Sequence, residues 1–252
     1  MNSLKEYLDE QTFLINTPAF IESDPVQFPR RYTRLQDIEI AAFLTATIAW
    51  GNRTMILKSA DRMLSKMGGS PCDYVLNEGY KTLGTANVHR TFFEHDLTYM
   101  LRGYRNILLR FKSIKAFLES KPDLNTPWDI AGALRSEIIK ANDNNPNSKC
   151  FPSNFEKSAI KRINLALRWL VRDDGIVDLG VWTLLKPSQL YIPLDVHVGN
   201  TARGLGILQR ASNDRKAVEQ LTGTLRGFCP EDPVKYDFAL FGIGIDKFSL
   251  QE

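Results

Sequence analysis

Asp195 and His197 lie in the stretch YIPLDVHVGNTARGLGIL, residues 191–208, just after Pro193. A proline followed by an aspartate is typical of the start of a helix, where the carboxylate caps free backbone N–H groups. The same N–H groups and the helix dipole favour anions, so His197 in the first turn is a candidate contact for phosphate. Asp195 is therefore either a helix cap alone or also a carboxylate that takes part in a reaction.

Two lysines, Lys157 and Lys161, precede this stretch in the segment FEKSAIKRINLALRWLVR. A neutral lysine amine is a nucleophile, and a carboxylate such as Asp195 can stabilise a positive charge that develops nearby. A helix lysine without any chemical role has the same sequence pattern, because its long stem covers helix surfaces. Both lysines remain candidates for the nucleophile.

Further residues have the side chains that bind nucleic acids. Trp50, Asn52 and Arg53 lie together in the segment AWGNRTM, where a tryptophan can stack on a base and an arginine can reach a phosphate. Arg168 shares a helix face with Lys161 and is a fourth candidate contact. A core position for Trp50 and a solvated basic face for the arginines are the alternative interpretations.

Helices must position these residues, because apolar side chains recur at three- and four-residue spacing along most of the chain. No alternation of strands with helices and no internal repeat occurs, so we predict an all-α fold with many short helices. Asp37 is a plausible cap of the first helix of a pair joined at Gly51. The predicted helical segments are 35–68 (as that pair), 92–120, 126–142 and 158–173, with a polar loop at 142–149 and an apolar helix or turn at 233–245.

The composition fits a globular protein of 252 residues, with 43% hydrophobic and 24% charged residues. A net charge of +3 permits a polyanionic partner without requiring one. The cysteines lack the spacing of zinc or iron–sulfur sites, so we expect reduced thiols and no bound metal. The first residues include acids and no long apolar run, and no later segment has about 20 apolar residues, so we expect no secretory signal, no membrane contact and a cytoplasmic protein.

The segment IPLDVHVGNTARGLG resembles the helix-hairpin-helix DNA glycosylases, especially the 8-oxoguanine type. The resemblance implies that Asp195 is the catalytic carboxylate and that His197 contacts DNA phosphate. Lys157, in the sequence Lys-Ser-Ala, matches the nucleophile of the endonuclease III branch, whereas IKRINLAL with Lys161 resembles the helix that follows the catalytic lysine in the archaeal 8-oxoguanine branch. The helix junction with Trp50, Asn52 and Arg53 resembles the junction in these glycosylases that inserts a side chain into the gap left by a flipped base.

Two departures from the family pattern concern the segment before Asp195. The family hairpin is close to LPGVG, and its glycines let backbone N–H groups approach phosphate, whereas this chain has CFPSNFEK without a glycine. Residues 173–190 also lengthen the interval between the candidate lysines and Asp195. From about residue 37 to the end, the similar segments occur in the same order as in the glycosylases. The whole pattern, including PEDPVKYDFALFGIGI, looks most like an uncharacterised bacterial family distantly related to them.

The resemblance implies an all-α, two-lobed, glycosylase-like unit over residues 1–252. One helical lobe would span 37–150, and the other would span 151–252 together with 1–36. The expected function is a DNA base-excision glycosylase for a damaged purine, with or without AP-lyase activity, acting on double-stranded DNA without a metal or organic cofactor. The alternatives are a non-catalytic nucleic-acid-binding protein that retains the fold and an unrelated helical scaffold in which Asp195 only caps a helix.

Overall fold

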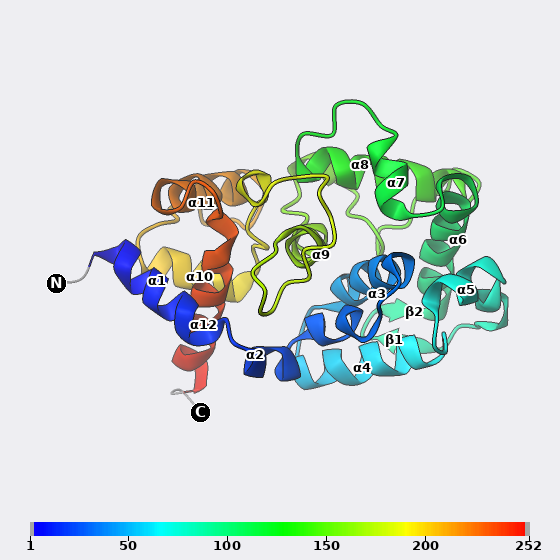
Figure 1. The fold of residues 1–252 in the computed structure, drawn as a ribbon, viewed down its shortest axis with the longest axis horizontal. Helices are drawn as coiled ribbons and strands as arrows, with labels where there is room; N and C mark the ends of the chain where they lie inside the picture. The colour runs from blue at the N-terminus through cyan, green and yellow to red at the C-terminus, as the bar shows by residue number, and fades with distance from the viewer. Residues whose placement is uncertain (1–2, 250–252) are drawn as a thin grey trace.

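A computed structural model describes residues 3–249, and the predicted all-α fold is confirmed (Figure 1). The exception is a small antiparallel hairpin of β1 (Asn87–His89) and β2 (Phe92–Phe93). The helices are α1 (Leu4–Ile15), α2 (Pro18–Ser23), α3 (Leu35–Ile48), α4 (Arg53–Ser65), α5 (Pro71–Leu76), α6 (Glu94–Phe111), α7 (Ile114–Glu119), α8 (Pro127–Lys140), α9 (Lys161–Val171), α10 (Val196–Gly204), α11 (Arg215–Phe228) and α12 (Tyr236–Ser249). Short 3-10 turns are η1 (Pro25–Gln27), η2 (Pro29–Arg31), η3 (Gly79–Thr82), η4 (Phe155–Lys157), η5 (Pro187–Gln189) and η6 (Pro233–Lys235).

The helix pair α3 and α4 is joined at Gly51, as the sequence predicts. Gly51 has φ +93°, a backbone conformation that a residue without Cβ adopts at little cost. Asp37 was expected to cap α3, and this expectation is wrong because the N-cap residue is Arg34. Asp37 lies in the first turn of α3, and its carboxylate accepts hydrogen bonds from Ser70 Oγ (2.9 Å) and Cys72 N (2.7 Å) at the start of α5.

The helical segment at 92–120 is divided into α6 and α7. Lys112 has φ +69°, and this left-handed residue ends α6. Ser113 then caps α7 by accepting a hydrogen bond from Ala116 N at 2.9 Å. The apolar spacing continues across this break, and for this reason periodicity alone does not reveal it.

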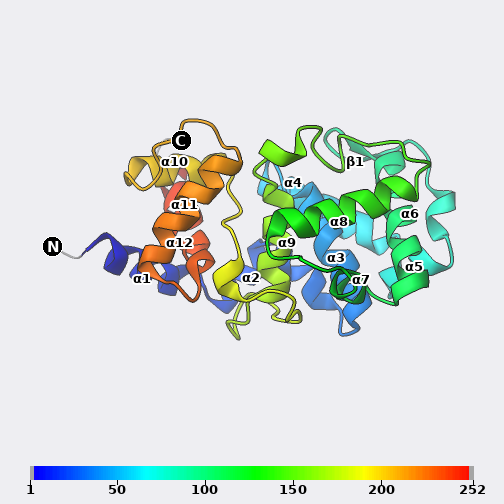
Figure 2. The ribbon, with the colours of Figure 1, turned by 90° about the horizontal axis from the view of Figure 1, so that it is seen from above.

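The helices form two groups, with α9 between them (Figures 1 and 2). One buried hydrophobic cluster joins α3, α4, α6 and α8 with residues of α9, and a second joins α1, α10, α11 and α12. Ala166, Leu167 and Trp169 of α9 belong to the first cluster, whereas Ala159 and Ile160, just before α9, belong to the second. The two clusters therefore meet at the start of α9, and α9 itself packs on α3.

Residues 173–190, which lengthen the interval before Asp195, pack into the first hydrophobic cluster. Val177, Trp182 and Leu185 are buried there, and the Trp182 indole donates to Glu39 Oε1 at 3.0 Å. Burial raises the pKa of Glu39 to about 7, although three N–H donors oppose the rise. This long connection thus has a structural role beside α3. Within residues 3–249, no helix combines the length and the apolar character that a membrane span requires.

Candidate active site

A strained turn places Lys161 at the first position of α9. Ile160, its N-cap, has φ +40° and is 5% exposed. A β-branched residue in this left-handed region is unfavourable and persists only where the surrounding structure holds it. Ser158 provides that support, because its Oγ accepts from Ile160 N (3.2 Å) and its carbonyl oxygen accepts from the Trp128 indole (3.0 Å).

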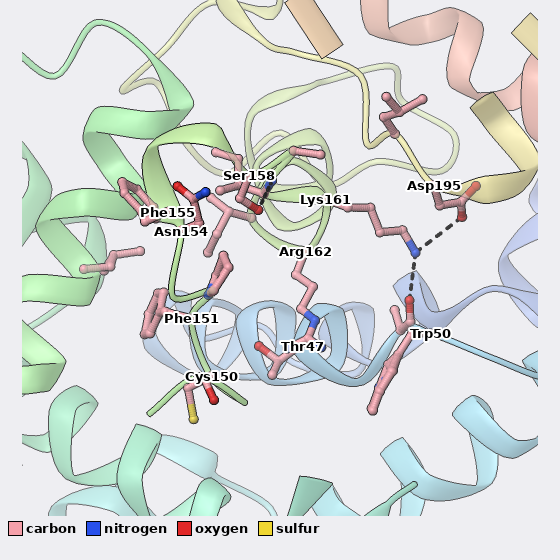
Figure 3. Close-up of a pocket in the computed structure, with 18 of the residues that line it drawn as sticks. Thr47, Trp50, Cys150, Phe151, Asn154, Phe155, Ser158, Lys161, Arg162 and Asp195 are labelled. Atoms are coloured by element: carbon pink, nitrogen blue, oxygen red, sulfur yellow. Dashed lines mark hydrogen bonds and ion pairs between the residues drawn. The ribbon is translucent and has the colours of Figure 1, made fainter. Parts of the chain in front are cut away.

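The Lys161 side chain connects three parts of the chain. Its Nζ donates a hydrogen bond to the carbonyl oxygen of Ala49 (2.7 Å), at the C-terminal end of α3. The same Nζ lies 3.5 Å from Asp195 Oδ2 (Figure 3). Because the Lys161 and Asp195 side chains are 24% and 25% exposed, the pair is half-buried and remains accessible to a ligand.

Asp195 combines a helix cap with this ion pair. Its Oδ1 accepts from Val198 N at 3.0 Å, so the predicted cap of α10 is confirmed. Its backbone oxygen also accepts from Asn213 Nδ2 at 2.9 Å. These two bonds hold the carboxylate in place, and its second oxygen, Oδ2, faces Lys161.

The Lys161–Asp195 pair lies in the wall of a pocket of about 740 Å³ (Figure 3). This volume is within the range of pockets that bind small molecules. The Phe43, Tyr104, Phe151 and Phe155 side chains supply aromatic surface. Polar lining residues include Thr47, Asn154, Lys157, Ser158, Arg162 and Asp214.

The two candidate lysines occupy different places in this pocket. Lys157 ends η4, is exposed and lines the pocket, but it belongs to none of the ion pairs formed by the described residues. Lys161 is within ion-pair distance of Asp195. The geometry therefore favours Lys161 as the residue that acts together with Asp195.

The junction of α3 and α4 brings Trp50 to the pocket. The Trp50 ring centroid lies 5.5 Å from the Arg90 guanidinium carbon and 5.2 Å from that of Arg162. His89 Nε2 lies 2.8 Å from the Trp50 carbonyl oxygen, and His89 Nδ1 lies 3.1 Å from Ser59 Oγ. This buried histidine therefore fixes the backbone next to Ala49, the hydrogen-bond partner of Lys161.

Asn52 and Arg53 do not line the pocket. Asn52 is exposed and caps α4 through a hydrogen bond from Met55 N (3.1 Å). Arg53 donates to Ser23 O and forms an ion pair with Asp24 at 3.0 Å. Arg53 thus joins α4 to the segment after α2.

His197 and Arg168 also lie outside the residues that line the pocket. His197 is exposed in the first turn of α10. It lies beside Gly244 of α12, because a Cβ atom added to that glycine would be 3.5 Å from the His197 Cβ. Arg168 is 3% exposed and forms ion pairs with Asp178 (3.3 Å) and Asp237. The position predicted for Arg168 on a nucleic-acid surface is therefore not observed, because these carboxylates hold its guanidinium in the interior.

Two residues near the site have no role in the sequence interpretation. Arg162 follows Lys161 directly and lines the pocket. Its place beside a candidate nucleophile in the sequence could have indicated this position. Asp237 is buried in α12, and burial, with the negative charge of Asp195, raises its pKa to about 6 against the opposing charge of Arg168. Nothing in the sequence around Asp237 indicates this proximity.

The described residues contain no group of three or more His, Cys, Asp or Glu side chains placed to hold a metal ion. A family model described as a protein of unknown function, DUF2400, matches residues 24–246. Neither a curated protein nor a solved structure matches the chain. The match begins after α1 and α2, covers all helices from α3 to α11 and most of α12, and includes every residue of the pocket.

Proposed function

Since the chain belongs to DUF2400, a family of unknown function, we propose from its own site that it is a DNA base-excision glycosylase with an associated lyase activity. Lys161 is the nucleophile and Asp195 is the carboxylate that stabilises the charged sugar. The substrate is a damaged purine in double-stranded DNA. The two helix groups form a two-lobed, glycosylase-like arrangement, with the site where the groups meet.

One observation carries this proposal: Lys161 Nζ lies 3.5 Å from Asp195 Oδ2 in the wall of a pocket of about 740 Å³. A base must leave the helical stack before its glycosidic bond can be reached, and the extruded base needs a pocket of this kind. An amine and a carboxylate at its edge are then placed to meet the sugar.

In the proposed reaction, the Lys161 ammonium first loses a proton to water, and the resulting neutral amine attacks C1′ of the sugar. The bond between C1′ and the base nitrogen breaks, and its electron pair leaves with the base, which takes up a proton. Asp195 faces the positive charge that develops on the sugar and stabilises it electrostatically. Loss of a proton from Nζ and opening of the sugar ring then give a Schiff base between Lys161 and C1′.

Exposed residues support contact with the DNA backbone. Lys157 and Asn154 line the pocket on the segment just before α9, and His197, outside the pocket, is exposed in the first turn of α10. Phosphate contacts of this kind position a duplex without reading its sequence. Residues 150–157 lack the glycines of the DNA glycosylase hairpin. We therefore assign these contacts to side chains and not to closely approaching backbone N–H groups.

Borohydride trapping on a duplex with one abasic site tests this proposal. Borohydride reduces the Schiff base to a stable amine and makes the covalent complex visible on a denaturing gel. We expect an adduct with the unmodified protein and with Lys157→Gln, and none with Lys161→Gln. Thermal melting of Lys161→Gln shows whether the fold survives loss of the bond to Ala49. An adduct with a folded Lys161→Gln protein would overturn the assignment.

A second function, binding of nucleic acid without catalysis, is favoured by one contact. Lys161 Nζ is closer to the Ala49 carbonyl oxygen (2.7 Å) than to Asp195 (3.5 Å), a geometry that also suits a purely structural lysine. Under this alternative, the unmodified protein binds the duplex but forms no adduct. The same trapping experiment, run beside a binding assay, separates the two functions.

A further inference from the structure

Arg162 is a basic residue of the pocket that lacks a counter-ion, as Lys157 does, but Lys157 is exposed and Arg162 is not. It is half-buried, and no carboxylate of the described residues lies within ion-pair distance of it. Its NH1 donates to the carbonyl oxygen of Lys149 at 2.7 Å, and its guanidinium lies against Trp50. Burial lowers the pKa of Arg162, as expected for a guanidinium removed from water without a carboxylate partner.

The guanidinium retains hydrogen-bonding capacity toward the pocket. A guanidinium carries five N–H donors in a rigid planar fork. One protein acceptor, the Lys149 carbonyl, is bonded to it. The Arg162 side chain extends toward Thr47 in the pocket, while Lys161 extends toward Asp195 (Figure 3). A ligand base held between them would meet Arg162 on one side and the reacting amine on the other.

A second donor in the pocket has no acceptor. The Nε1 atom of Trp50 is buried without a hydrogen-bond partner among the described residues. Buried donors without acceptors are costly, but this atom is shielded from solvent, as is Nε1 of Trp169 in the core, so it does not by itself indicate a ligand. The Arg162 fork, which has one protein acceptor and lies beside aromatic side chains of the pocket, indicates a flat ligand whose edge presents acceptors.

We propose that Arg162 is the residue that selects the base, and that it favours 6-oxopurines such as hypoxanthine, whose O6 and N7 atoms both accept hydrogen bonds. This inference rests on the proposed glycosylase function. An arginine fork matches adjacent O6 and N7 acceptors, whereas an adenine-type base presents an amino donor at position 6, opposite the guanidinium. Lys161 and Asp195 perform the reaction, and Arg162 sets the preference among bases.

The test compares the release of two bases from otherwise identical duplexes, hypoxanthine and unsubstituted purine, which lacks O6. With the unmodified protein, we expect hypoxanthine to be released roughly 10-fold to 100-fold faster, the discrimination of one bidentate pair. Arg162→Gln and Arg162→Lys should reduce this ratio to about 3-fold or less, since neither side chain forms the fork. The ratio is an internal control, because partial loss of active protein slows both reactions equally.

Trapping on an abasic site separates the failure of this inference from the failure of the proposed function. An abasic site has no base to select, so the Arg162 variants should still form the Lys161 adduct, whatever its rate. An adduct together with an unchanged ratio of base release would overturn the role of Arg162 alone. If the unmodified protein forms no adduct and releases neither base, the glycosylase function itself is contradicted.

Discussion

The two ends of α9 carry basic residues in very different surroundings. At the C-terminal end, Arg168 and Arg172 are 3% and 6% exposed, and each forms ion pairs with at least two carboxylates. At the N-terminal end, Lys161 has one ion pair of 3.5 Å, and Arg162 has none among the described residues. The C-terminal end of α9 thus contributes fully paired cations to the interior. Its N-terminal end presents incompletely paired cations to the pocket.

This difference separates structural charges from candidates for chemistry. Buried charges contribute to a fold only when several partners offset their loss of hydration, and Arg168 and Arg172 meet this condition. Charges beside a cavity that lack such partners are the ones a ligand can complete. The number of carboxylates around each cation, rather than its place on the helix face, is therefore the useful criterion.

The largest effect is expected from Arg168→Ala. Its loss leaves Asp178 and Asp237 in the interior without their shared partner, which should lower the free energy of unfolding by about 3–5 kcal/mol. Lys161→Ala should cost about 1 kcal/mol or less, because its ion pair is half-exposed. Urea denaturation of both variants measures the difference. Equal losses would show that the two ends of α9 do not differ as described.

Asp195→Asn should have the next largest effect, on catalysis rather than on folding. Asparagine caps helices as well as aspartate does, so the free energy of unfolding should change by less than about 1 kcal/mol. Loss of the carboxylate charge should slow base release about 100-fold or more. Asp24→Asn is the matched control, since Asp24 caps η1 through Val26 N and pairs with Arg53 but does not line the pocket. Equal slowing in both variants would contradict a specific role for Asp195.

Lys157→Gln should weaken DNA binding modestly and leave catalysis unchanged. Because Lys157 is exposed at the pocket, its loss should weaken duplex binding a few-fold at every sequence and reduce the salt dependence by about one phosphate contact. Trapping at saturating DNA should be unchanged. Lys81→Gln, on η3, is the control for a general loss of positive charge. Loss of trapping in the Lys157 variant would move the nucleophile from Lys161 to Lys157.

The smallest effect concerns pH and Asp237. Its pKa in the folded protein is about 6, above its ordinary value of 3.8, so its protonated form favours folding. This contribution is complete below pH 3.8 and is lost as the pH rises through about 6. Asp237→Asn should therefore remove part of the decline in stability between pH 4 and 7, as measured by chemical denaturation. An unchanged profile would show that Asp237 does not titrate in this range.

Helix periodicity and capping patterns predicted most of the fold. The segments that became α3, α4, α8, α9 and α10 could be located from apolar spacing, proline and aspartate. The break at Lys112 and the role of Asp37 could not, because both depend on contacts with distant segments. The packing of residues 173–190 beside α3 likewise depends on the hydrogen bond between Trp182 and Glu39.

The sequence predicted most of the residues of the candidate site but not their arrangement. Asp195, Lys157, Lys161 and Trp50 all reach the pocket, yet only the three-dimensional structure separates the two lysines. Arg168 could not be distinguished from Lys161 by position, since the two lie on one helix face. The carboxylates that hold Arg168 come from residue 178 and from α12, far from α9 in the sequence.

The most direct test of the central claim is to identify the residue that forms the Schiff base. The unmodified protein is trapped with borohydride on a duplex with an abasic site, digested and analysed by fragment mass spectrometry. We predict that the reduced sugar remnant is attached to Nζ of Lys161. Attachment to Lys157 or to the N-terminal amine, or the absence of any covalent product from protein that binds the duplex, would contradict the account.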